Sequence, residues 1–147
     1  VEAIGRLTHA GYRVIIATNQ SGIGRGLLDM AAYNAINDKM YKAVNQIGGR
    51  IDAIFFCPHT SADQCNCRKP ATGMFDEIVQ RYGVTLKNVP IIGDSLKDLQ
   101  AAAAVGAIPV LVLTGDGQNT HTHPDVPADT QVFESLAAAV DALAGEA

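Results

Sequence analysis

Three cysteines and one histidine lie close together, as Cys57-Pro58-His59 followed by Cys65-Asn66-Cys67. The chain has no other cysteine, and three is an odd number, so a disulfide scaffold is a poor explanation. Three thiolates and one imidazole favour tetrahedral Zn²⁺, and four protein ligands leave no position for a reacting water. The pattern predicts a structural zinc ion held by Cys57, His59, Cys65 and Cys67. The alternative is three free cysteines beside an unrelated histidine.

A polar segment, Thr18-Asn19-Gln20-Ser21, directly follows a run of β-branched residues. A hydroxyl at the end of a strand, followed by free backbone amides in a turn, can hold phosphate oxygens. The same residues also occur simply as turn caps, so the segment alone leaves both interpretations open.

Two adjacent cations, Arg68 and Lys69, follow the last cysteine without a gap. An arginine can bind a phosphate dianion through two parallel hydrogen bonds, and a lysine can bind it as a point charge. A solvated basic pair is the alternative. A zinc-bound loop immediately before the pair would fix the direction of these side chains, which favours the phosphate-binding interpretation.

Acidic side chains follow a third apolar run, in Gly93-Asp94-Ser95 and then Asp98. Mg²⁺ prefers a few carboxylate oxygens together with several waters, so Asp94 is a candidate ligand. An aspartate at the start of a helix is also a common N-cap, and either acid could have that role.

The hydrophobic pattern places these segments at the ends of predicted strands. Strands alternating with helices predict an α/β fold, in which a parallel sheet is covered by helices on both faces. Ligands bind such sheets at the carboxyl ends of the strands. The polar segments 18–21, 57–69 and 93–95 all fall at these ends. The expected strands are 12–17, 51–56, 89–92, 107–113 and 131–133, the expected helices are 2–10, 29–47, 72–82, 96–105 and 134–144, and 114–128 is expected to be an irregular loop.

Composition narrows the class of protein. The 147 residues are 48% hydrophobic and 18% charged, which is typical of one globular domain. A net charge of −4 argues against binding to nucleic acid. Apolar runs are of strand length, so a membrane partner is not expected either. We expect a cytoplasmic monomer that acts on a small molecule.

In this order the motifs resemble the haloacid dehalogenase (HAD) superfamily of phosphohydrolases. Thr18 matches the second motif of that family, Lys69 the third, and Asp94 with Asp98 the fourth. The resemblance implies a HAD-like, Rossmann-like fold and Mg²⁺-dependent hydrolysis of a phosphoric monoester. It assigns catalytic roles to Thr18, Lys69 and Asp94, with Asp94 as the Mg²⁺ ligand. The implied substrate-binding residues are Thr18, Asn19, Gln20, Ser21, Arg68 and Lys69.

Within the superfamily, the zinc loop followed directly by Arg68-Lys69-Pro70 resembles the corresponding segment of the heptose-bisphosphate phosphatases. The similarity implies removal of the 7-phosphate of D-glycero-D-manno-heptose 1,7-bisphosphate through an aspartyl-phosphate, in the synthesis of lipopolysaccharide core precursors. Histidinol-phosphate phosphatases share the zinc loop and are the alternative. They are expected to carry Asp in place of Ser21, which favours the heptose substrate.

One family motif has no counterpart here. The nucleophile and the general acid belong to an Asp-x-Asp motif, and none of the chain's eleven aspartates forms one. We therefore expect the nucleophile on a first strand upstream of Val1, so that residues 1–147 are a single, N-terminally incomplete HAD-like domain. A non-catalytic module that binds zinc or phosphate is the alternative from another class.

Overall fold

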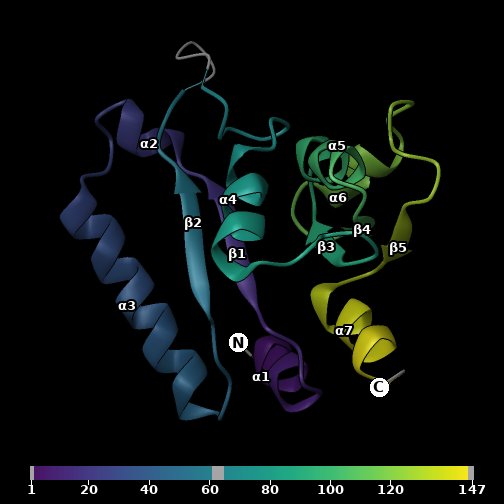
Figure 1. Ribbon diagram of the computed structural model, residues 1–147, viewed down its shortest axis with the longest axis horizontal. Coiled ribbons are helices and arrows are strands. Elements are labelled where there is room, and N and C mark those ends of the chain that lie inside the picture. Colours follow the sequence, from purple (N-terminus) through teal and green to yellow (C-terminus); the bar gives the residue numbers. More distant parts are fainter. Residues whose placement is uncertain (1, 61–64, 146–147) are drawn as a thin grey trace. The chain divides into compact units, whose positions relative to one another are not determined.

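The computed structural model describes residues 2–60 and 65–145, apart from the side chains of residues 21, 22 and 145 (Figure 1). The chain divides into two compact units. The first runs to Arg68 and includes the C-terminal end from Leu143, and the second is Lys69–Ala142.

The first unit is built on two parallel strands. They pair from Ile15 with Ala53 to Asn19 with Cys57, so Thr18, Asn19 and Cys57 lie at the carboxyl ends. Asp29 caps the long helix that connects the strands, because its carboxylate accepts from the Ala32 N–H at 2.7 Å. The elements are α1 (Glu2–His9), β1 (Ile15–Asn19), α2 (Ser21–Gly24), α3 (Met30–Gln46) and β2 (Ala53–Cys57).

The second unit contains three parallel strands in the order β3-β4-β5. Val110 and Val112 of β4 are buried with Ala139 of α7, which packs one helix onto the central strand. Its elements are α4 (Gly73–Tyr82), β3 (Pro90–Gly93), α5 (Leu96–Ala104), β4 (Ile108–Val112), α6 (Gly117–His121), β5 (Gln131–Phe133) and α7 (Leu136–Gly145), the last of which continues into the first unit.

The predicted α/β fold with parallel strands is confirmed, with corrections at three places. The strand expected at 12–17 is β1, Ile15–Asn19, so Thr18 and Asn19 are its last residues and not part of a turn. The predicted loop 114–128 contains the helix α6, and Ser21 begins the short helix α2. Both helices are too short to show the periodicity on which sequence reasoning depends. Within the described residues, no helix is long and apolar enough to span a membrane.

Candidate functional site

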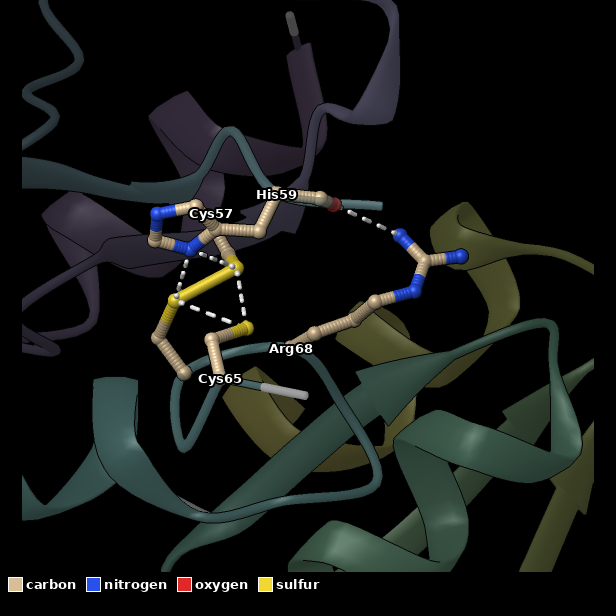
Figure 2. Close-up of a disulfide and its surroundings, with 5 residues drawn as sticks. Cys57, His59, Cys65 and Arg68 are labelled. Atoms are coloured by element: carbon tan, nitrogen blue, oxygen red, sulfur yellow. Dashed lines mark hydrogen bonds between the residues drawn. A yellow bond between two sulfur atoms is a disulfide. The ribbon is translucent and has the colours of Figure 1, made fainter. Parts of the chain in front are cut away.

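The four predicted zinc ligands converge in the first unit (Figure 2). Cys57 is the last residue of β2, and the other three follow in the loop. One ligand atom from each residue lies within 4.8 Å of the others. Cys57 Sγ is 3.4 Å from Cys65 Sγ and 3.5 Å from His59 Nδ1. Cys67 Sγ is 3.3 Å from His59 Nδ1 and 3.6 Å from Cys65 Sγ.

Four of the six separations among these atoms suit one tetrahedral zinc ion, whereas Cys57 and Cys67 are at the distance of a disulfide. With Zn–S near 2.3 Å and Zn–N near 2.0–2.1 Å, the ligand atoms of a tetrahedral site lie about 3.5–3.8 Å apart, close to the four separations above. The structure joins Cys57 to Cys67 as a disulfide and leaves Cys65 as a thiol. A disulfide engages only two of the four converging groups and gives no role to Cys65 or to the imidazole of His59. The donor set as a whole is the one that zinc uses.

The cysteine loop is tied to the polar segment that follows β1. The Gln20 N–H donates to the Cys57 carbonyl at 2.7 Å, which extends the hydrogen bonding between the strand ends by one bond. Gly24 lies so close to the loop that a Cβ at this position would be 2.3 Å from the Pro58 carbonyl oxygen. Only glycine permits this approach. Arg68 donates through Nη1 to the His59 carbonyl at 3.5 Å (Figure 2). Gln20 and Gly24 are therefore in direct contact with the cysteine loop.

Thr18 presents its hydroxyl at the end of β1. Gln20 donates from Nε2 to Thr18 Oγ1 at 3.1 Å, so the hydroxyl oxygen is an acceptor on that side. Among the described residues, the hydroxyl proton then has only a long contact with the Asn19 carbonyl, at 3.5 Å. A hydroxyl that accepts from an amide directs its own proton away from it, which suits donation to a phosphate oxygen. Ser21 begins α2, and its side chain lies outside the described part of the chain.

In the second unit, Lys69 and Asp98 form a largely buried ion pair. Lys69 Nζ contacts Asp98 Oδ1, and the two side chains are 12% and 14% exposed. The other oxygen, Asp98 Oδ2, accepts from Ser95 Oγ at 2.9 Å and from the Ser95 N–H at 3.3 Å. Ser95 is the N-cap of α5 and forms a capping box with Asp98. Neither aspartate is therefore the N-cap, which corrects that alternative for Asp94 and Asp98.

Asp94, directly after β3, is held by a different segment. Asp94 Oδ2 accepts from the Asp116 N–H at 3.1 Å, and its carbonyl accepts from Thr120 Oγ1 at 2.8 Å. Among the residues that the structure describes, no donor reaches Asp94 Oδ1. Sequence reasoning missed Asp116 and Thr120. The Gly115-Asp116-Gly117 sequence after a buried strand was the available signal, because glycines there indicate a tight turn.

The predicted residues fall into two local groups. Thr18, Asn19, Gln20, Ser21, Arg68 and the four zinc ligands belong to the first unit, and Lys69 and Asp94 belong to the second. His121 and His123 are exposed, and His123 Nδ1 accepts from the Asp125 N–H at 3.1 Å.

Comparison with known proteins gives consistent matches. A family profile described as HAD-hydrolase-like matches residues 66–139. The chain is 53% identical over 147 residues to the D-glycero-beta-D-manno-heptose-1,7-bisphosphate 7-phosphatase of Bordetella bronchiseptica, covering 100% of this chain and 82% of that protein. It is 49% identical over 139 residues to the protein of the same name from Neisseria meningitidis, covering 92% and 74%.

A solved structure agrees with these matches. The crystal structure of D,D-heptose 1,7-bisphosphate phosphatase from B. bronchiseptica, complexed with magnesium and phosphate, is similar with a TM-score of 0.96 and 53% identity. The match covers 99% of this chain and 82% of that one.

Proposed function

The chain belongs to the HAD hydrolase family, as a Mg²⁺-dependent hydrolase of phosphoric monoesters, and on that premise we propose that its substrate is D-glycero-D-manno-heptose 1,7-bisphosphate. The observation that carries the proposal is 53% identity along the whole chain to an enzyme named for that substrate. The chemistry is removal of the 7-phosphate, a step toward lipopolysaccharide core precursors. Thiolate zinc ligands suit a reducing compartment, so we place the protein in the cytoplasm. We also propose that it is a monomer.

The residues share the work of phosphoryl transfer by position and charge. Thr18 donates its hydroxyl proton to a phosphoryl oxygen, and the Lys69 ammonium neutralises another. Asn19, Gln20, Ser21 and Arg68 bind the rest of the anionic substrate. Asp94, with one oxygen fixed by a backbone N–H, would hold Mg²⁺ through the other. Bound Mg²⁺ supplies charge neutralisation and orientation at the phosphate.

These residues neutralise charge, but the proposed reaction also needs a carboxylate that attacks phosphorus. No two aspartates in the 147 residues are separated by a single residue. We therefore assign the aspartyl-phosphate nucleophile and its partner acid to residues outside this sequence, with these 147 residues as the remainder of a single HAD-like domain. The tests below use the natural protein that contains this chain.

The substrate assignment predicts a clear preference. We expect kcat/KM for heptose 1,7-bisphosphate to exceed that for histidinol phosphate by about tenfold or more, a difference of about 1.4 kcal/mol in transition-state binding. The physical reason is charge: the adjacent cations Arg68 and Lys69 attract the negatively charged bisphosphate, and the neutral Ser21 does not repel it. Turnover of both substrates by the same preparation decides the matter. A higher kcat/KM for histidinol phosphate would reverse the assignment, and absence of phosphate release from either would favour a non-catalytic binding module.

We also propose that zinc is held by Cys57, His59, Cys65 and Cys67, as a structural ion. The support is the convergence of four donors, with four of their six separations close to those of one tetrahedral ion. Such an ion would order the loop that contacts Gln20 and Gly24, and would thereby fix the segment that includes Thr18.

Metal analysis tests the zinc assignment. We expect about one zinc per chain in protein purified without chelator, and a large loss of zinc in Cys65→Ser, because serine is a poor ligand for this ion. The KM for substrate should rise in that variant through the contacts of Gln20 with Cys57. Asn66→Ala is the matched control, since Asn66 is exposed between two of the ligands. Zinc-free protein that contains a Cys57–Cys67 disulfide by mass spectrometry would overturn the assignment.

A further inference from the structure

The segment 115–120 is fitted around Asp94 from two sides. Its Asp116 N–H donates to the Asp94 carboxylate at 3.1 Å, and its Thr120 hydroxyl donates to the Asp94 carbonyl at 2.8 Å. One contact restrains the side chain and the other restrains the backbone. Together they limit both the position of Asp94 and the rotation of its carboxylate group.

Thr120 approaches Asp94 from the buried side. Thr120 is 4% exposed, and its hydroxyl also lies 3.2 Å from the Asp116 carbonyl at the start of its own helix. The contact with Asp94 is the shorter of the two. A buried hydroxyl that is hydrogen-bonded to a strand-end carbonyl has a defined place, because leaving either group unpaired is costly.

Gly115 shows how closely the segment approaches the carboxylate. Its φ is +58°, in the left-handed region that favours glycine, and a Cβ there would lie 2.2 Å from Asp94 Oδ2. Any side chain at this position would displace the oxygen that the Asp116 N–H holds. The turn thus restrains the Asp94 carboxylate both by close steric contact and by a hydrogen bond.

We propose that residues 115–120, here called the Asp94 cradle, are a positioning element that fixes Asp94 Oδ2 so that Asp94 Oδ1 is presented to Mg²⁺. Thr120 is a positioning residue within it and does not touch the ion. The proposal rests on the proposed function, because it assumes that Asp94 is the Mg²⁺ ligand. It states that the affinity of Asp94 for Mg²⁺ depends on residues that lie 21 to 26 positions further along the chain.

The test compares two glycine variants of the natural, zinc-loaded protein. Gly106 has a φ of +76°, and a Cβ added to it would meet nothing within 4 Å, so Gly106→Ala carries a similar backbone cost without contact to Asp94. We expect Gly115→Ala to raise the Kd for Mg²⁺, measured by titration calorimetry, by about tenfold or more, and Gly106→Ala to leave it unchanged. Equal Kd values in the two variants would overturn the proposal.

A second pair covers the case in which Gly115→Ala does not fold. Thr120→Val keeps the shape but removes the donor, and we expect it to raise the Kd for Mg²⁺ about fivefold. Thr120→Ser restores the hydroxyl and should restore the Kd. A Thr120→Val protein that binds Mg²⁺ as the wild type does would overturn the proposal while leaving the proposed function intact. Wild-type protein that neither binds Mg²⁺ nor releases phosphate would overturn both.

Discussion

Asp94→Asn is expected to reduce kcat by about 10²–10⁴, the equivalent of the several kcal/mol that a metal ion contributes to a phosphoryl transition state. Asparagine has the shape of aspartate and can still accept from the Asp116 N–H, but it lacks the negative charge that attracts Mg²⁺. Zinc content should stay unchanged, because zinc uses sulfur and imidazole ligands and not carboxylate. The measurements are kcat against Mg²⁺ concentration and metal content of the same samples.

Asp125→Asn is the matched control for this substitution. Asp125 is exposed in the same unit, so its change removes the same charge without touching the candidate site. We expect its kcat and its Mg²⁺ dependence to match those of the wild type. If Asp94→Asn turned over substrate with the wild-type Mg²⁺ dependence, Asp94 could not be the ligand.

Lys69→Met is expected to abolish most activity and also to destabilise the fold. It removes the ammonium to which we assign neutralisation of the phosphate, and it leaves the Asp98 carboxylate as a buried charge without its cation. Breaking one side of a buried ion pair costs about 3–5 kcal/mol, although the Ser95 cap retains part of the stabilisation of Asp98. Unfolding by denaturant and turnover at saturating substrate measure the two effects separately.

The double variant Lys69→Met with Asp98→Asn separates these roles. Asparagine still accepts from Ser95 but carries no charge, so the free energy of unfolding should recover by most of the loss. Activity should not recover, because the cation assigned to the phosphate is still missing. Recovery of activity in the double variant would show that Lys69 acts only through stability.

Local signals in the sequence predicted the elements that depend on neighbours along the chain. The predicted helices 29–47 and 72–82 correspond to α3 and α4, which are capped by Asp29 and by Gly83 with a φ of +62°. The cysteine cluster was predictable for the same reason, since all four donors lie within eleven residues and a short loop must bring them close together. The residues 131–133 were predicted as a strand and form β5.

The contacts that shape the second unit were not predictable in this way. Lys69 and Asp98 are 29 positions apart, and Asp94 and Thr120 are 26 apart. The type of a single residue does not reveal which distant residue will become its partner in the fold. Covariation between two positions could reveal it, but covariation cannot be observed in one sequence. Thr120 was also hidden because a five-residue helix such as α6 gives no periodic pattern.

The double engagement of Asp98 has a consequence for how this protein can change over evolutionary time. One carboxylate oxygen of Asp98 pairs with Lys69, and the other accepts a hydrogen bond from Ser95. A substitution at position 98 therefore affects two interactions at once. Asparagine preserves the helix cap but discards the charge, and glutamate preserves the charge but adds a methylene between the fixed partners. We therefore expect substitution of Asp98 to be tolerated mainly where Lys69 has been replaced as well. For the same reason we expect residues 69, 95 and 98 to vary together among relatives of this chain.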